Sequence, residues 1–152
     1  VCPVTSIEDQ YSMMWRKPEN ELFKVCEELG IGFMAYSPLG NGFLSGQLTK
    51  ETKYQEGDFR NFMERFKPEV IEHNQALLDL IALIADRKNA TSAQVVLSWE
   101  LAQKPYIVPI PGTTKLHRLE ENFKAATVQL TAEELAGINE ALAKVDINET
   151  FF

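Results

Sequence analysis

The sequence alternates short β-type segments with helical segments three times, and this order restricts the fold more than any other feature of its 152 residues. Residues 3–8 alternate apolar and polar side chains, residues 31–36 form a short apolar run without alternation, and residues 106–110 form a third run. Parallel strands are joined by helical crossovers of this kind. An apolar run without alternation is typical of a strand buried on both faces of a parallel sheet. The predicted fold class is therefore α/β with a parallel sheet.

The first helical segment is indicated by its apolar spacing and by the residues at its two ends. Pro18 opens it, Leu22, Cys26 and Leu29 share one face, and Gly30 ends it. Pro near the start and Gly just past the end of a helix are the expected arrangement.

The other helices carry similar signals. They are predicted over residues 69–88, 91–103, 115–125 and from residue 131 onward. The first of them ends at Asn89, a plausible C-cap. Thr91 with Gln94 and Thr131 with Glu134 match the capping-box pattern, in which each partner hydrogen-bonds the backbone of the other.

Residues 37–67 connect the second strand to the next helix, and this connection is too long for an ordinary loop. It is rich in Gly, polar residues and scattered aromatics. Long loops of this type usually serve a function, so we expect this one to take part in binding.

Three strands cannot close a barrel, which takes about eight. Parallel strands left at an edge expose unpaired backbone groups and apolar side chains. Either a further chain segment supplies the remaining strands, or the three strands pack as a small open sheet, or two copies of the chain associate. The chain starts with Val, and strand-like sequence begins almost at once, which suggests part of a larger protein. We expect one partial domain spanning residues 1–152.

Charge and composition exclude several classes of partner. With 15 Lys and Arg against 22 Asp and Glu, the net charge is −7, so the molecular field repels nucleic acid and anionic lipid surfaces. No stretch approaches the roughly 20 apolar residues that cross a bilayer, and the N-terminus lacks a signal-peptide pattern. Cys2 and Cys26 form no metal-type motif. We expect a cytoplasmic protein in a reduced compartment, with no metal site and no nucleic-acid or membrane partner.

The segment after the third strand has the composition of a phosphate site. Gly112 permits close backbone approach, Thr113 and Thr114 offer hydroxyl groups, and the helix that follows presents Lys115 and Arg118 near its N-terminus. Helix N-termini favour anions, and phosphate often binds at this place in a (β/α)₈ barrel. A capped turn with solvated charges explains the same residues about equally well.

The end of the second strand is a weaker candidate. Tyr36 could stack on a planar ligand, and residues 37–42 could line a pyrophosphate. A Tyr that closes a buried strand before a Pro turn is more often part of the core. At the end of the first strand, Glu8 and Asp9 point to opposite faces, so they do not readily share a substrate.

Three motifs in this order resemble the aldo-keto reductase family. They are residues 7–12 with Arg16, residues 35–40 with 42–44, and residues 109–115 with 118–122. The resemblance extends over almost the whole chain, from Val4 to about Val145. It implies the C-terminal part of a (β/α)₈ TIM barrel, beginning at about the sixth strand. It also implies an NADPH-dependent oxidoreductase that reduces aldehydes or ketones to alcohols.

The resemblance also implies roles for individual residues. Tyr36 is expected to stack on the nicotinamide, with Ser37, Leu39 and Asn41 or Gly42 along the pyrophosphate. The residues expected at the adenosine 2′-phosphate are Gly112, Thr113, Lys115 and Arg118. The residues expected at the adenine are Glu121 and Asn122.

This chain departs from the family pattern at one cofactor position and does not contain the family's catalytic residues. Glu8 stands where the family usually carries a Gln against the nicotinamide carboxamide, with Gln10 two residues on. The family's catalytic Asp, Tyr, Lys and His lie on the first four strands, so no catalytic residue is assigned here. We expect the chain alone to be inactive. The alternatives are an inactive nucleotide-binding fragment and an oligomerising module with a vestigial site.

Overall fold

The computed structural model describes residues 2–49 and 51–150. Its sheet has three parallel strands in the order β1 (Ser6–Gln10), β2 (Gly32–Tyr36) and β3 (Ile107–Pro109). Glu8 pairs in register with Met34, and Met34 pairs with Val108. The predicted α/β class and parallel sheet are confirmed, although the first strand begins and ends two or three residues later than predicted.

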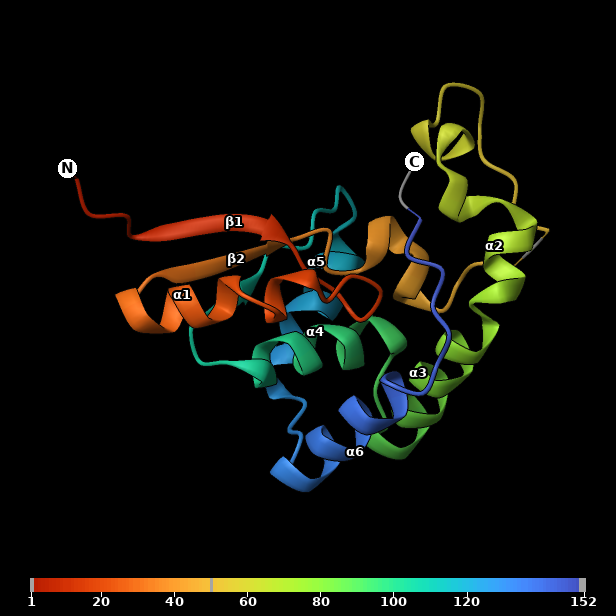
Figure 1. Cartoon of the computed structure of the whole chain (residues 1–152). Helices are drawn as coiled ribbons and strands as arrows, with labels where there is room; N and C mark the ends of the chain where they lie inside the picture. The colour runs from red at the N-terminus through yellow and green to blue at the C-terminus, as the bar shows by residue number, and fades with distance from the viewer. Residues whose placement is uncertain (1, 50, 151–152) are drawn as a thin grey trace.

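Helices follow each strand and also fill the long segment between β2 and β3. The α-helices are α1 (Leu22–Leu29), α2 (Pro68–His73), α3 (Gln75–Lys88), α4 (Ser92–Gln103), α5 (Leu116–Lys124) and α6 (Ala132–Leu142). The 3₁₀ helices are η1 (Lys17–Glu19), η2 (Gly40–Ser45), η3 (Phe59–Phe62), η4 (Glu64–Phe66) and η5 (Ala125–Thr127). Figure 1 shows α1 and α4 beneath β1 and β2, with α3 and α6 at the far end of the molecule.

The predicted helix ends are confirmed where a side chain or a left-handed residue specifies them. Thr91 with Gln94 and Thr131 with Glu134 both form complete capping boxes. Gly30 ends α1 at φ 64°, in the left-handed region that suits a residue without a Cβ.

The predicted helix over residues 69–88 is two helices, because the chain breaks at Asn74. The Asn74 amide is fully buried, donates to the carbonyl of Asn148 and accepts from the Asn148 backbone N–H. This exchange ties the C-terminal tail to the junction of α2 and α3, along which Figure 1 shows the tail running. A tertiary contact therefore overrides the helical periodicity.

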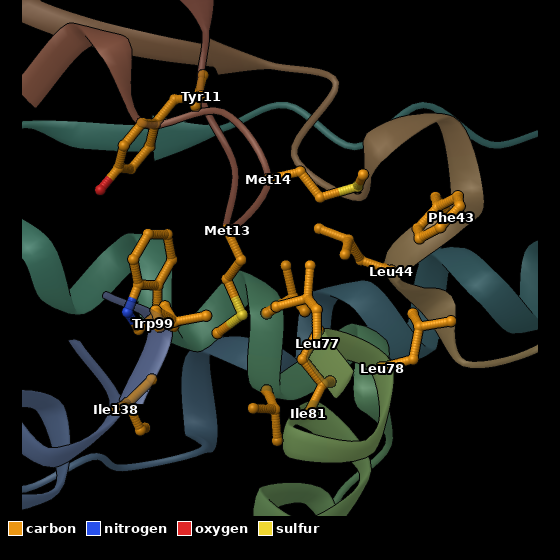
Figure 2. Packing of buried hydrophobic residues seen from close by; sticks show 14 of the residues in the cluster. Tyr11, Met13, Met14, Phe43, Leu44, Leu77, Leu78, Ile81, Trp99 and Ile138 are labelled. Carbon is orange, nitrogen blue, oxygen red and sulfur yellow. The ribbon is translucent and has the colours of Figure 1, made fainter. Parts of the chain in front are cut away.

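The core lies between one face of the sheet and the helices. Trp99 on α4 stacks on Tyr11 with ring centroids 5.5 Å apart, and Phe23 and Phe33 add edge contacts around Tyr11. Figure 2 shows this aromatic cluster continuing through Met13 toward α3 and α6. Met13 and Met14, in the segment that follows β1, are both buried in this core.

Two burial predictions are wrong. β2 is not buried on both faces: Phe33 and Ala35 are buried against the helices, whereas Met34 is partly exposed and Tyr36 is 36% exposed. Leu29 does not share the buried face of α1 but is 67% exposed. Both departures have the same cause: the described helices cover one face of the sheet, and no described element covers the other face or the outer side of α1.

Candidate functional site

A cavity of about 570 Å³ lies between the segment that follows β2 and the segment that follows β3. Its volume is within the range of about 300–1,000 Å³ that ligand pockets usually have. Its lining brings together most of the site residues expected from sequence: Ser37, Leu39, Asn41, Gly42, Gly112, Thr113, Arg118, Glu121 and Asn122. The chain thus folds two segments about 70 residues apart in the sequence, 37–42 and 112–122, into one site.

The first wall has an unusual backbone. Ser37 and Asn41 have φ of 51° and 60°, and Gly40 and Gly42 also have positive φ. Such conformations in residues other than Gly cost free energy and gather at ligand-binding sites. Successive backbone amides in turns of this kind form concave sites for anions. The wall is held internally, because the Ser45 hydroxyl donates to the Gly42 carbonyl at 2.7 Å.

The second wall runs from β3 into α5. The Ile110 N–H donates to the carbonyl of Ala35, which continues the pairing of the two strands. A Cβ placed on Gly112 meets no protein atom within 4 Å, so the glycine leaves open space on the cavity side. The Thr113 hydroxyl accepts from the Lys115 N–H at 3.1 Å and thereby shapes the turn that begins α5.

Residues 57–60 border the cavity from the long loop. Arg60 binds both carboxylate oxygens of Asp58, with the shortest distance 2.6 Å, and lies over the Tyr54 ring at 4.4 Å from its centroid. The hydrogen bonds from Arg60 lower the pKa of Asp58 to about 2, so this carboxylate is ionised and already paired at neutral pH. Asp58 and Arg60 neutralise each other at the cavity rim.

Arg118 has a different electrostatic environment. Its Nη2 donates to the side-chain oxygen of Gln47 at 3.1 Å, and no ion pair joins it to a carboxylate of the described residues. The guanidinium carries five N–H donors in a planar fork, so most remain free for an anion. The cavity therefore contains one cation whose charge no described carboxylate balances at contact distance.

Three expected site residues do not line the cavity. Glu8 is exposed on β1, Tyr36 lies at the end of β2, and Lys115 is exposed at the start of α5. Tyr36 and Lys115 lie next to cavity-lining segments in the sequence. Glu8 lies farther away, on β1, which pairs with the strand that carries Tyr36.

Sequence reasoning missed other residues that line the cavity: Ser45, Gln47, residues 57–60 and Ala93. The length of loop 37–67 signals that part of it serves a function, but no local pattern places residues 57–60 or Gln47 beside α5. Long-range contacts of this kind depend on how the loop packs against α4.

Two kinds of feature are absent from the residues that the structure describes. Residues 2–49 and 51–150 contain no group of three His, Cys, Asp or Glu side chains placed to hold a metal ion. None of the helices described is both long and apolar enough to cross a membrane.

Comparisons of the sequence and of the fold with known proteins point to the same family. The model of the aldo/keto reductase family matches residues 1–143. Probable aldo-keto reductase 1 of Glycine max is 37% identical over 145 residues, which cover 95% of this chain and 42% of that protein. A glycerol dehydrogenase from Gluconobacter oxydans superposes with a TM-score of 0.84 at 22% identity, covering 100% of this chain and 47% of that one.

A thermostable aldo-keto reductase solved with the inhibitor epalrestat superposes with a TM-score of 0.62 at 26% identity, covering 90% of this chain and 39% of that one. The chain thus spans less than half the length of these relatives. Its three-stranded α/β fold corresponds to part of the (β/α)₈ barrel of its structural relatives. On its sequence match and its fold, the chain belongs to the aldo/keto reductase family.

Proposed function

We propose that this chain is the cofactor-binding half of an NADPH-dependent oxidoreductase that reduces aldehydes or ketones to alcohols. The observation that carries the proposal is the cavity in which the segments after β2 and β3 meet around Arg118. Family membership supports an oxidoreductase acting on carbonyl compounds. We propose a cytoplasmic location for the protein.

The residues of the cavity fit a dinucleotide with a 2′-phosphate. Arg118 supplies a cation with free donors for the phosphate, and Gly112 leaves room beside it. Thr113 adds a hydroxyl, and Lys115 adds a second cation at the helix start. Glu121 and Asn122 lie on the same helix and offer polar groups to the adenine.

The tight turns of the other wall are the proposed place of the pyrophosphate. Ser37, Leu39, Asn41 and Gly42 line the cavity there, and Ser37, Asn41 and Gly42 have positive φ, which is typical of turns that bind anions. We propose that Tyr36, which is 36% exposed at the end of β2 and directly precedes the lining residue Ser37, stacks on the nicotinamide. When bound, the reduced nicotinamide supplies the hydride for carbonyl reduction.

Glu8 is a departure within this assignment. It is exposed in register with Met34, two residues before the buried Gln10. A carboxylate can accept a hydrogen bond from the carboxamide nitrogen of a nicotinamide but cannot donate one to its oxygen. We propose that Glu8 holds the carboxamide through the nitrogen alone.

The acid and base of the reaction are assigned to no residue of this chain. We propose that they come from a segment that completes the barrel, in the same polypeptide or in a separate one. Apolar side chains remain exposed on or beside the sheet, on α1 and on α5, and we propose that this segment covers them: Val4, Val108, Ile110, Val25, Leu29, Leu116, Leu119 and Phe123. Self-association of two copies is the rival occupant of these surfaces, and the chain would then be a binding or oligomerising module.

Fluorescence titration of the purified chain with NADPH and NADH tests the cofactor assignment. We expect tighter binding of NADPH, and Arg118→Ala should weaken it by about tenfold or more because a charge-assisted hydrogen bond is lost, with little change for NADH. Lys124→Ala is the matched control, since it removes an exposed cation from the far end of the same helix. Equal losses for both cofactors would contradict the assignment.

A turnover assay tests the proposal that the acid and base of the reaction lie outside this chain. With NADPH and a small aldehyde, the chain alone should show no steady consumption of NADPH. Sustained turnover by the chain alone would mean that it contains its own proton donor, and the proposed division of roles would be wrong.

A further inference from the structure

The hydrogen bond between Gln47 and Arg118 joins the two walls of the cavity. Gln47 follows η2 on the β2 side, and Arg118 lies in the first turn of α5 on the β3 side. The side-chain oxygen of Gln47 accepts from Arg118 Nη2 at 3.1 Å, across 71 residues of sequence. Both residues line the cavity, so the bond connects its two walls where they meet solvent.

The backbone that carries Gln47 is held against the start of α4. Gly46 has φ of 72°, and a Cβ at this position would lie only 2.7 Å from the Ser92 hydroxyl oxygen. The loop can approach α4 this closely because residue 46 has no side chain. This close packing fixes the position of the backbone that leads into Gln47.

The start of α4 also holds the other wall. Gln94, which completes the capping box of α4, donates through its side-chain nitrogen to the Glu121 carbonyl of α5 at 3.1 Å. One helix end thus sets the spacing between the backbones of Gln47 and Arg118. With the two backbones held in this way, the hydrogen bond between the Gln47 and Arg118 side chains determines where the guanidinium lies.

The chemistry of Gln at position 47 matters for what Arg118 can bind. A neutral carbonyl oxygen holds one N–H of the guanidinium without cancelling its charge, so the remaining donors and the full charge still face the cavity. A carboxylate at the same place would pair with the guanidinium and repel a second anion. Asp58, the nearby acid of the rim, is already paired with Arg60.

We propose that Gln47 is a positioning residue that sets the preference for a 2′-phosphate, by holding Arg118 in the cavity while leaving its charge available. This inference rests on the proposed function and adds the residue that controls its cofactor selectivity. A neutral hydrogen-bond acceptor at position 47 favours the 2′-phosphate, and an anion there opposes it.

Calorimetric titration with adenosine 2′,5′-bisphosphate and with adenosine 5′-monophosphate tests the inference, because the two probes differ only by the 2′-phosphate. We expect Gln47→Glu to weaken binding of the bisphosphate by about tenfold through repulsion of a near-dianion, and to change monophosphate binding by less than about twofold. Gln129→Glu is the control, since it adds the same charge at an exposed position outside the cavity.

A double-mutant cycle separates positioning from simple charge. Gln47→Ala should weaken bisphosphate binding about two- to threefold in the unmodified chain and have no further effect beside Arg118→Gln, because it acts through Arg118. Additive losses, or equal losses for both probes, would overturn the role of Gln47. Circular dichroism checks that the exposed substitutions leave the fold intact.

The failures of the two proposals are distinguishable. If the unmodified chain binds the two probes equally, or binds neither, the 2′-phosphate site is wrong and the role of Gln47 is wrong with it. If the unmodified chain prefers the bisphosphate and the Gln47 variants keep that preference, only the role of Gln47 is overturned.

Discussion

Helices α4 and α5 pack against each other and yet differ completely in how this chain supports them. Most of α4 is buried, including Val95, Val96, Leu97 and Trp99, and it contacts the sheet, α3 and α6. None of the described residues of α5 is buried. Its apolar side chains point outward, with Phe123 81% exposed.

The difference shows which of the two helices this chain buries by itself. α4 is surrounded by elements of the same chain, so its apolar residues gain burial on all sides. α5 follows the edge strand β3, and its polar residues Arg118, Glu121 and Asn122 line the cavity. The proposed cofactor site is thus built partly on a helix with no buried residue among those described.

The largest expected effect on stability comes from comparing Trp99 in α4 with Phe123 at the corresponding position of α5. Trp99→Ala should lower the free energy of unfolding by about 3–5 kcal/mol, because a fully buried indole leaves a cavity beside Tyr11. The lost hydrogen bond from the indole nitrogen to Asn139 adds to this loss. Phe123→Ala should change it by less than about 0.5 kcal/mol, since an exposed ring has no burial to lose. Urea unfolding of both variants measures the two changes in the free energy of unfolding. Similar losses of stability would contradict the difference between α4 and α5.

Glu100 is the anomaly within α4, and it predicts a pH dependence. The carboxyl is fully buried with no hydrogen-bond partner among the described residues, and burial raises its pKa well above 4.5. An acid whose pKa is raised by folding destabilises the fold as pH increases above its unfolded pKa, until the folded pKa is reached. Each pH unit in that window costs up to about 1.4 kcal/mol.

Glu100→Gln should therefore leave stability almost unchanged near pH 4 and raise it increasingly toward neutral pH. Thermal unfolding from pH 4 to pH 8 measures this difference. Parallel pH profiles of the variant and the unmodified chain would show that Glu100 is not a buried neutral acid.

The helix starts offer a smaller contrast. Thr91 accepts from the Gln94 N–H, so Thr91→Ala should cost about 1 kcal/mol through loss of the N-cap. Lys115 precedes α5 and makes no side-chain cap bond to the residues described there, so Lys115→Ala should cost less than about 0.3 kcal/mol. The midpoints of urea unfolding compare the two, and equal shifts would argue against the capping box.

Leu116→Gln should also have little effect on the stability of the isolated chain, because Leu116 is 70% exposed. We expect a change within about 0.5 kcal/mol and no loss of folding. Sedimentation at increasing concentration sharpens the result: a self-association that Leu116→Gln abolishes would show that a second copy covers α5.

Much of the fold could be predicted from local sequence. The capping boxes at Thr91 and Thr131 and the left-handed ends at Gly30 and Asn89 depend on neighbouring residues alone, and all four are present. The break at Asn74 could not be predicted, because its partner Asn148 lies 74 residues further along the chain.

The site divides in the same way. The motifs around Ser37 and Gly112 indicate where ligand-binding turns form, and both line the cavity. The contact of Gln47 with Arg118 and the place of residues 57–60 have no local signal. Glu8 was expected at the site from the motif resemblance, and it lies outside the cavity lining on an exposed position of β1.

The sequence by itself determined the succession of strands and helices, most helix ends and the family, because these depend on short-range spacing, caps and motifs. The tertiary structure decided which side chains are buried, where the helical segment divides and which segments share a cavity. Those outcomes depend on contacts between distant residues and on how many neighbours surround each element, which no local pattern records.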